Sequence, residues 1–316
     1  MIRHLFQLLG ACLFLVHATA ALAADPIPIK IGYIPVGDCL QYYVAEEMGY
    51  FAAEGLAATG LAMKGGAVIA PAVEGGELAI GWSNTVSIIL AHAKGFDFVF
   101  LAPGAEGVAG SHDVHALLVA ADSKIASVAD LAGKTVAVNT LGNINEAAMR
   151  ALAEKAGIAP DSIRLVEVPF PDMAGTLAKG SVQAALVLEP FVTDAVSRGA
   201  ARVLDPSPHA AFGSPYLIGG WFAKKAWIKA HPAEAAAFLR AVAKASAFIA
   251  ATPDKAREIL RERTKLAPEL AAKIVLPRFP ETLVPAALTG IIDVAARYGL
   301  LAKPFPAAEI LAAPGD

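Results

Sequence analysis

Cysteine is almost absent from this sequence. The chain has two cysteines in 316 residues, and the first, Cys12, lies in an N-terminal segment that we expect to be removed. Since only Cys39 then remains, neither an internal disulfide nor a cysteine-based zinc site can form. Basic residues are not in excess either, because 26 Lys and Arg stand against 29 Asp and Glu. Nucleic acid is therefore not an expected partner.

Long apolar runs are also missing beyond the N-terminal segment. No later stretch reaches the roughly 18 apolar residues that a membrane-spanning helix needs. The segment itself has the pattern of a secretory signal peptide: Arg3, a largely apolar run over Leu5–Val16, and the small-residue site Ala21-Leu22-Ala23. We expect cleavage after Ala23 and release into the periplasm.

A lipoprotein signal is the alternative interpretation of this segment. Leu9-Gly10-Ala11-Cys12 resembles a lipoprotein box, in which Cys12 would carry the lipid. The apolar run continues past Cys12 to Val16, however, and only Leu5–Leu9 would precede the box. Free secretion is therefore favoured.

The rest of the chain predicts a two-lobed α/β protein. Its length exceeds that of one usual domain, and 56% of the residues are hydrophobic. Apolar β-branched runs alternate with helical patterns, which favours mostly parallel sheets covered by helices. Strands are expected at 27–34, 56–61, 78–81, 98–102, 115–121, 135–139, 164–168, 184–188 and 216–223, and the chain from 227 onward is expected to be mainly helical. The predicted division is a signal peptide at 1–23, one lobe from 24–113 plus 216–316, and a second lobe from 114–215.

Three motifs that could carry chemistry are weak. Gly133-Lys134-Thr135 resembles the end of a phosphate-binding loop, but Val128 stands where the loop needs glycine. Ser83 follows a predicted strand like a hydrolase nucleophile, yet no second glycine follows it. His112 and His115 would point to opposite faces of a strand, so a solvated hinge is favoured over a metal site.

Polar residues follow three predicted strands at the point where a helix begins. Asp38 with Gln41, Asn84, and Asn143 with Glu146 have the spacing of helix caps. Helix N-termini present unpaired N–H groups and a partial positive charge. Two lobes that present such ends together predict a ligand cleft between them.

Several segments resemble the nitrate/sulfonate/taurine-type solute-binding proteins of ABC transporters. They are Ile31-Gly32-Tyr33-Ile34-Pro35, the stretch from Ala45 to Leu56 (AEEMGYFAAEGL), Glu77–Gly81, Asp130–Val138 and Ala184–Phe191. This resemblance implies a two-lobed periplasmic-binding-protein fold of type II that closes on one small solute. It further implies delivery to a membrane permease with an ATPase, and we expect a monomer without cofactor, metal or catalytic residues. Carried over by position, the ligand-binding residues are Gly37, Asp38, Cys39, Trp82, Ser83, Asn84, Thr85, Thr140, Gly142, Asn143, Glu189, Phe191, Gly220 and Trp221.

Departures from the family pattern point to the solute. None of the predicted ligand loops contains Lys or Arg, and Gly219-Gly220 stands where taurine binders place an acidic residue before Trp221. Asp38 and Glu189 are carboxylates, which favour a solute with donor groups. We expect a sulfonate- or taurine-like solute, or an amine or amino-heterocycle, with any anionic end at a helix N-terminus. Whether Glu189 contacts the solute or is structural stays open.

An enzyme of the same fold is the alternative function. The resemblance extends to the pyrimidine synthase of thiamine biosynthesis and to enzymes of the menaquinone pathway. Those enzymes are intracellular, whereas the N-terminus of this chain predicts export. The solute-binding interpretation is therefore preferred.

Overall fold

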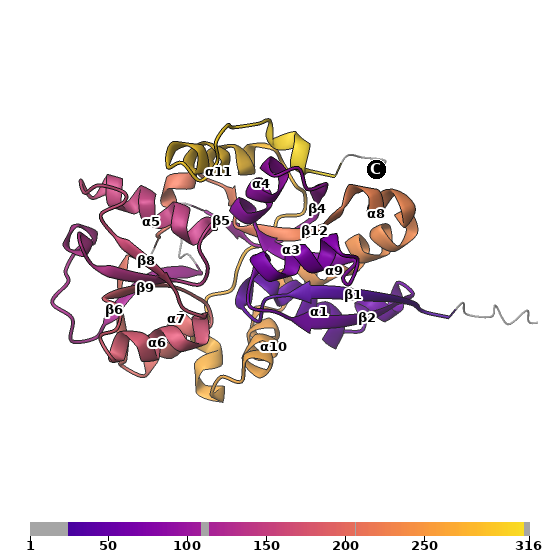
Figure 1. Ribbon diagram of the computed structural model, residues 1–316. Coiled ribbons are helices and arrows are strands. Elements are labelled where there is room, and N and C mark those ends of the chain that lie inside the picture. Colours follow the sequence, from indigo (N-terminus) through magenta and orange to yellow (C-terminus); the bar gives the residue numbers. More distant parts are fainter. Residues whose placement is uncertain (1–24, 109–113, 206, 313–316) are drawn as a thin grey trace, which may run out of the picture.

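The computed structural model describes residues 25–108, 114–205 and 207–312, which form two five-stranded sheets covered by helices (Figure 1). The predicted signal peptide, its alternative lipidation site Cys12, and His112 lie outside the described residues. The α/β class with mostly parallel sheets is confirmed.

The first sheet has the strand order β2-β1-β3-β12-β4. Its strands are β1 (Ile27–Tyr33), β2 (Leu56–Ala62), β3 (Ile80–Asn84), β4 (Phe98–Pro103) and β12 (Gly219–Lys224). β1 pairs in parallel with β2 and β3, whereas β12 is antiparallel to β3 and β4. β12 is the strand on which the chain returns from the second sheet, which explains its opposite direction.

The second sheet has the order β10-β6-β9-β7-β8. It comprises β6 (His115–Ala120), β7 (Thr135–Val138), β8 (Arg164–Glu167), β9 (Ala184–Leu188) and β10 (Ala201–Asp205). β7 is parallel to β8 and β9, and β6 is antiparallel to β9 and β10. Here too the antiparallel strand is the one that has just entered from the other sheet.

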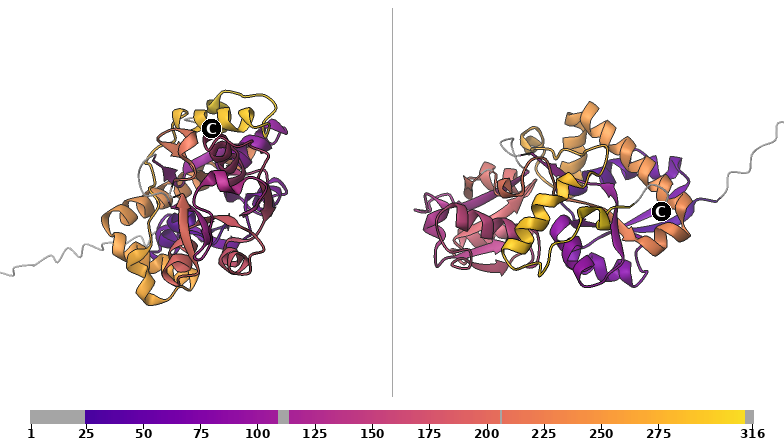
Figure 2. Two further views of the ribbon diagram at one scale, coloured as in Figure 1. Left: turned by 90° about the vertical axis from the view of Figure 1, so that its left-hand side faces the viewer. Right: turned by 90° about the horizontal axis from the view of Figure 1, so that it is seen from above.

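The chain passes between the sheets through two short strands that pair with each other. β5 (Glu106–Gly107) leads out of the first sheet and β11 (Tyr216–Leu217) leads back, in antiparallel register. α11 (Ala286–Arg297) contacts α4 beside the first sheet and α5 beside the second. Figure 2 shows this helix lying across both units. The lobe boundaries stay a prediction.

Helices cover both faces of each sheet. Beside the first lie α1 (Leu40–Glu47), α2 (Tyr50–Ala53), α3 (Gly66–Glu74), α4 (Thr85–Ala93), α8 (Lys225–Ala230), α9 (Pro232–Ala251) and α10 (Pro253–Thr264). Beside the second lie α5 (Ile144–Lys155), α6 (Phe170–Ala178) and α7 (Phe191–Ser197). Short 3₁₀ turns are η1 (Gly37–Cys39), η2 (Val128–Leu131), η3 (Ala210–Phe212), η4 (Pro268–Lys273) and η5 (Ala307–Ile310).

The structure differs from the sequence expectations at five elements. The strand expected at 78–81 runs on to Asn84, so Trp82 and Ser83 belong to β3 rather than to a loop. The strand expected at 216–223 is interrupted at Ile218, whose N–H bonds to Ala105 O. The helix expected at 268–274 is the 3₁₀ turn η4, and α6 and β10 were not predicted.

In the described part of the chain, no single helix is long and apolar enough to cross a membrane. The bent pair α9 and α10 meets the length and composition test only together, with an angle of 114° between them.

Candidate functional site

A small cavity lies where the two sheets face each other. Its volume is about 20 Å³, close to the space of one water molecule. It is lined from the first sheet and its loops by Ile34, Val36, Asp38, Trp82, Asn84 and Ile218, and from the second by His115, Asn139, Asn143, Ile144, Asn145, Phe170 and Leu188. Because both halves of the molecule contribute, movement of one sheet against the other would change the cavity.

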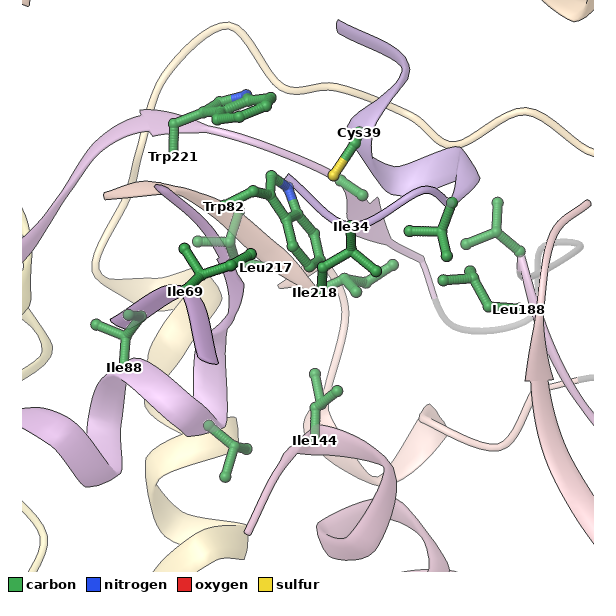
Figure 3. Packing of buried hydrophobic residues seen from close by; sticks show 14 of the residues in the cluster. Ile34, Cys39, Ile69, Trp82, Ile88, Ile144, Leu188, Leu217, Ile218 and Trp221 are labelled. Atoms are coloured by element: carbon green, nitrogen blue, oxygen red, sulfur yellow. The ribbon is translucent and has the colours of Figure 1, made fainter. Parts of the chain in front are cut away.

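Apolar side chains form one wall of this cavity. The Trp82 ring lies beside Ile34 and Ile218, and Ile144 and Leu188 approach from the second sheet (Figure 3). Trp82 is 2% exposed, and its indole Nε1 has no hydrogen-bond partner among the described residues.

Four polar side chains form a buried chain, and three of them, Asp38, His115 and Asn145, line the cavity. Asp38 Oδ2 lies 4.0 Å from His115 Nε2, and the His115 ring makes an edge contact with His209 at 4.4 Å between centroids. Nε2 of His209 is 3.1 Å from Oδ1 of Asn145. Asp38, on η1 before α1, is thereby connected to the first turn of α5 through His115, at the start of β6, and His209, just before η3.

Three asparagines and Thr140 surround the start of α5. Asn143 is the N-cap, since its Oδ1 accepts from the N–H groups of Asn145 (3.0 Å) and Glu146 (3.1 Å). The Asn143 amide donates to Asn139 Oδ1 (2.7 Å) and to Thr140 Oγ1 (3.0 Å). The predicted cap is present, and its side chain also faces the cavity.

Asn84 caps two helices that belong to different sheets. Its Oδ1 accepts from the N–H of Ser87 (3.0 Å) in α4 and from the N–H of Ile144 (3.1 Å) in α5. A second direct link between the halves is the bond from Gly37 N–H to Glu189 O (3.0 Å).

The structure brings only part of the predicted ligand set to the cavity. Asp38, Trp82, Asn84 and Asn143 line it, while Thr140 and Gly142 lie in the loop that leads to the Asn143 cap. Four predicted residues are packed elsewhere in the first half of the molecule: Cys39, whose thiol pKa is raised well above its usual value by burial, Thr85, whose hydroxyl donates to Leu217 O, Gly220, which lies against Ala102 O, and Trp221.

Trp221 and Glu189 make internal contacts. The Trp221 indole donates to Gln41 Oε1 (2.8 Å), which turns the ring toward Phe238 in the core. The Glu189 carboxylate accepts from Thr193 N–H (3.1 Å), Thr193 Oγ1 (2.8 Å) and Val275 N–H (3.3 Å). Burial raises the Glu189 pKa, and these hydrogen bonds oppose that shift.

Ser83, on β3, packs against the start of α3 and does not line the cavity. A Cβ placed on Gly66 would come within 2.1 Å of Ser83 Oγ, and Gly65 lies close to Thr140 of the second half. Ser83 is fully buried, its hydroxyl has no hydrogen-bond partner in the described chain, and α3 has no side-chain cap. Ser83 and the first turn of α3 therefore offer hydrogen-bond donors where β3 meets α3.

A second, wider space adjoins the cavity and opens outward. This vestibule has a volume of about 250 Å³. Its lining is Ile34, Pro35, Val36, Ala62, Met63, Lys64, Pro169, Phe170, Pro171 and Phe191. Ile34, Val36 and Phe170 line both spaces, so the two adjoin each other.

Sequence reasoning missed several cavity residues. His115 was expected in a solvated hinge but is 2% exposed, because it pairs with Leu188 in the second sheet and its ring packs against His209. Asn139 and Asn145 carried a usable signal, since with Asn143 they place three amides around one strand-to-helix junction. Phe170 carried none, because α6 itself was not predicted. Between 25 and 312, outside the two short gaps, no group of three His, Cys, Asp or Glu is placed to hold a metal ion.

The fold and the two-sided cavity define the class of protein. Alkanesulfonate-binding protein SsuA from Xanthomonas axonopodis pv. citri, solved with bound MOPS, has a TM-score of 0.77 to this chain. The match covers 92% of this chain and 99% of that one at 18% identity. The chain therefore has the fold of the periplasmic binding proteins.

The family follows from the sequence comparison. The NMT1/THI5-like family model matches residues 37–256, and the chain belongs to this family. The nitrate import ATP-binding protein NrtC of Synechocystis sp. is 24% identical over 76% of this chain and 37% of its own. An Escherichia coli K12 protein named "Putative aliphatic sulfonates-binding protein" is 30% identical over 48% of this chain and 46% of its own. The chain thus spans less than half the length of these curated relatives.

Proposed function

We propose that this protein is the periplasmic solute-binding component of an ABC importer. The observation that carries the proposal is the cavity lined from both sheets, which solute contacts can close. Solute that touches both halves stabilises the closed arrangement, and a permease would recognise that arrangement. The sulfonate-binding and nitrate-import relatives support this role. No observation favours the enzyme alternative.

The solute class is a small polar organic molecule with hydrogen-bond donors. Neither Lys nor Arg lines the cavity, whereas Asp38 does so at 1% exposure. A carboxylate at the cavity wall accepts charge-assisted hydrogen bonds from cationic or N–H donors, so an amine or amino-heterocycle suits this position. A sulfonate or carboxylate end would lie at Ser83 and the first turn of α3.

A thermal-shift screen tests the proposal on the purified protein. The panel contains sulfonates, amines, nitrate, bicarbonate and pyrimidines. A cognate solute at 100 times its dissociation constant should stabilise the fold by about 2.7 kcal/mol. Failure of every panel member to shift the transition would count against the proposed solute class.

Calorimetry on variants then tests which end of the solute lies at Asp38. Asp38→Asn should weaken an amine-bearing solute about tenfold or more, because a charge-assisted hydrogen bond is lost. Asp161→Asn, at an exposed position, is the matched control and should bind as the unaltered protein does. Equal affinities in all three proteins would remove Asp38 from the site.

Export and partnership are separate parts of the proposal. Cell fractionation should place the protein in the periplasm with an N-terminus at Ala24. A cytoplasmic protein with intact Met1 would contradict the role.

A further inference from the structure

The vestibule has the chemistry of an aromatic-ring site. Its walls are aliphatic and aromatic, and Lys64, an exposed residue, is its one charged member. Sites for apolar groups have such walls with few polar atoms. The adjoining cavity also has an apolar wall, but unlike the vestibule it is lined in addition by Asp38, His115 and four asparagines.

The volumes of the two spaces divide the solute into two parts. The inner cavity of about 20 Å³ admits only a small polar group. The vestibule of about 250 Å³ exceeds the roughly 150 Å³ in which an engineered apolar cavity of another protein holds benzene. A polar head can therefore extend inward while a ring stays outside it.

Two phenylalanines of the second half line the vestibule, Phe170 at 6% exposure and Phe191 partly buried. Phe170 follows β8 and Phe191 follows β9, and neither ring contacts another aromatic ring among the residues that the structure describes. Aromatic rings elsewhere in the protein do pair, such as Tyr33 with Tyr42 at 4.7 Å. Edge and stacked contacts between rings add stabilisation beyond apolar burial.

Rigid and polarisable groups complete the walls. Pro35 lies on the side of the first sheet, and opposite it Pro169 caps α6 while Pro171 lies in the first turn of that helix. Proline loses little conformational freedom when a ligand packs on it. Met63 adds a thioether, which makes favourable contacts with aromatic rings.

We infer that the cognate solute carries an aryl group, which lies in the vestibule between Phe170, Phe191 and Met63 while the polar head enters the cavity. The inference rests on the proposed function and narrows its solute class. Nitrate and taurine, which have no apolar ring, would leave the vestibule unused.

Calorimetry with paired probes tests the inference. The pairs are ethylamine with 2-phenylethylamine and ethanesulfonate with 2-phenylethanesulfonate, so that either polar head is covered. We expect the phenyl member of at least one pair to bind about tenfold or more tighter, as burial of a ring predicts. We also expect it to bind more tightly than its 2-cyclohexylethyl counterpart.

Two variants locate the ring. Ala62→Phe fills the vestibule from the exposed end of β2 and should abolish the phenyl advantage, whereas Ala57→Phe, exposed on the same strand, should keep it. Phe191→Leu should reduce the preference for phenyl over cyclohexyl. If a ring-free solute binds and its phenyl counterpart binds no more tightly, the aryl inference is overturned while the transport role stands. The same holds if the extra affinity of the phenyl solute is unchanged in Ala62→Phe. Cyclohexyl that equals phenyl would overturn it too, and absence of binding by every solute would instead count against the proposed function.

Discussion

The carboxamide oxygen of Asn84 accepts the backbone N–H of Ile144 across the gap between the two sheets, at 3.1 Å. The same oxygen accepts from Ser87 N–H in its own half of the molecule. A side chain that completes one helix therefore also holds the start of another. In this arrangement the N–H groups in the first turn of α5 have hydrogen-bond partners without any solute group. The Ser83 hydroxyl and the start of α3 still have donors without partners in the described chain.

Replacement of Asn84 by alanine should loosen the closed arrangement. Loss of the cap should lower the free energy of unfolding by about 1 kcal/mol. Because the link to Ile144 is also lost, the radius of gyration measured by X-ray scattering should rise and solute affinity should fall. Ser127→Ala removes the cap of η2, which does not join the halves, and should lower stability alone. An unchanged radius in Asn84→Ala would show that this bond does not hold the sheets together.

The two tryptophans of the first sheet should respond differently to phenylalanine. Trp221→Phe leaves the buried Gln41 carbonyl oxygen without its indole donor, which should cost about 1–3 kcal/mol of stability. Its solute affinity should be unchanged. Trp82→Phe breaks no internal hydrogen bond in the described chain but alters the cavity wall, so affinity should fall with a smaller loss of stability. Urea unfolding and calorimetry on both variants separate the two effects, and a reversed pattern would exchange their roles.

Glu189 should make stability depend on pH. Its pKa is raised by burial, so the folded protein holds this proton more tightly than the unfolded chain does. The free energy of unfolding should therefore fall as pH rises from about 4.5 through the pKa of the folded state. Urea titrations between about pH 4 and pH 7 cover the range in which carboxyl groups with raised pKa titrate. In Glu189→Gln the fall of the unfolding free energy with pH should lose the part due to Glu189, whereas Glu269→Gln, at an exposed position, should retain it. If the unfolding free energy changes with pH in the same way in the unaltered protein and in both variants, the raised pKa of Glu189 is contradicted.

Position 66 should tolerate alanine only if the side chain of Ser83 is also shortened. The added Cβ would meet Ser83 Oγ at 2.1 Å, and this clash should outweigh the gain of up to about 1 kcal/mol that alanine gives inside a helix. Ser83→Ala should relieve most of the cost, which gives a coupling of about 0.5–3 kcal/mol in a double-mutant cycle. Gly175→Ala in α6, where a Cβ meets nothing within 4 Å, should stabilise. Additive effects of Gly66→Ala and Ser83→Ala would place the hydroxyl away from α3.

Local sequence patterns predicted most of the fold because they reflect local physics. Leu40, Tyr43 and Val44 of the stripe predicted with Met48 are buried in α1, whereas Met48 follows the helix end and is exposed. Asn143 has the side chain and spacing of a cap. β9 begins and ends where its apolar run does. α6 was missed because Pro169 and Pro171 flank its first residue, so that Phe170 lies in a segment resembling a turn.

Side-chain direction at the site could not be predicted in the same way. Trp82 and Trp221 are register partners on adjacent strands, yet only Trp82 lines the cavity. The difference comes from Gln41, which is far from Trp221 in sequence and takes its indole N–H. His115 and His209, which are far apart in the sequence, likewise meet only because the two parts of the chain that pass between the sheets lie together. Such contacts depend on tertiary packing, which no local pattern records.

The pairing of β5 with β11 has a consequence for how such proteins diversify. Gly107 and Tyr216 are register partners, so the polypeptide leaves the first sheet and re-enters it at almost one point. Everything between them is an insertion with adjoining ends, and such insertions can be exchanged without redirecting the host chain. Recombination at this seam would pair a new set of asparagines and phenylalanines with the unchanged Asp38 and Trp82. Such an exchange, with one crossover at each end of the segment, would alter one wall of the cavity while the first sheet and its helices are inherited intact.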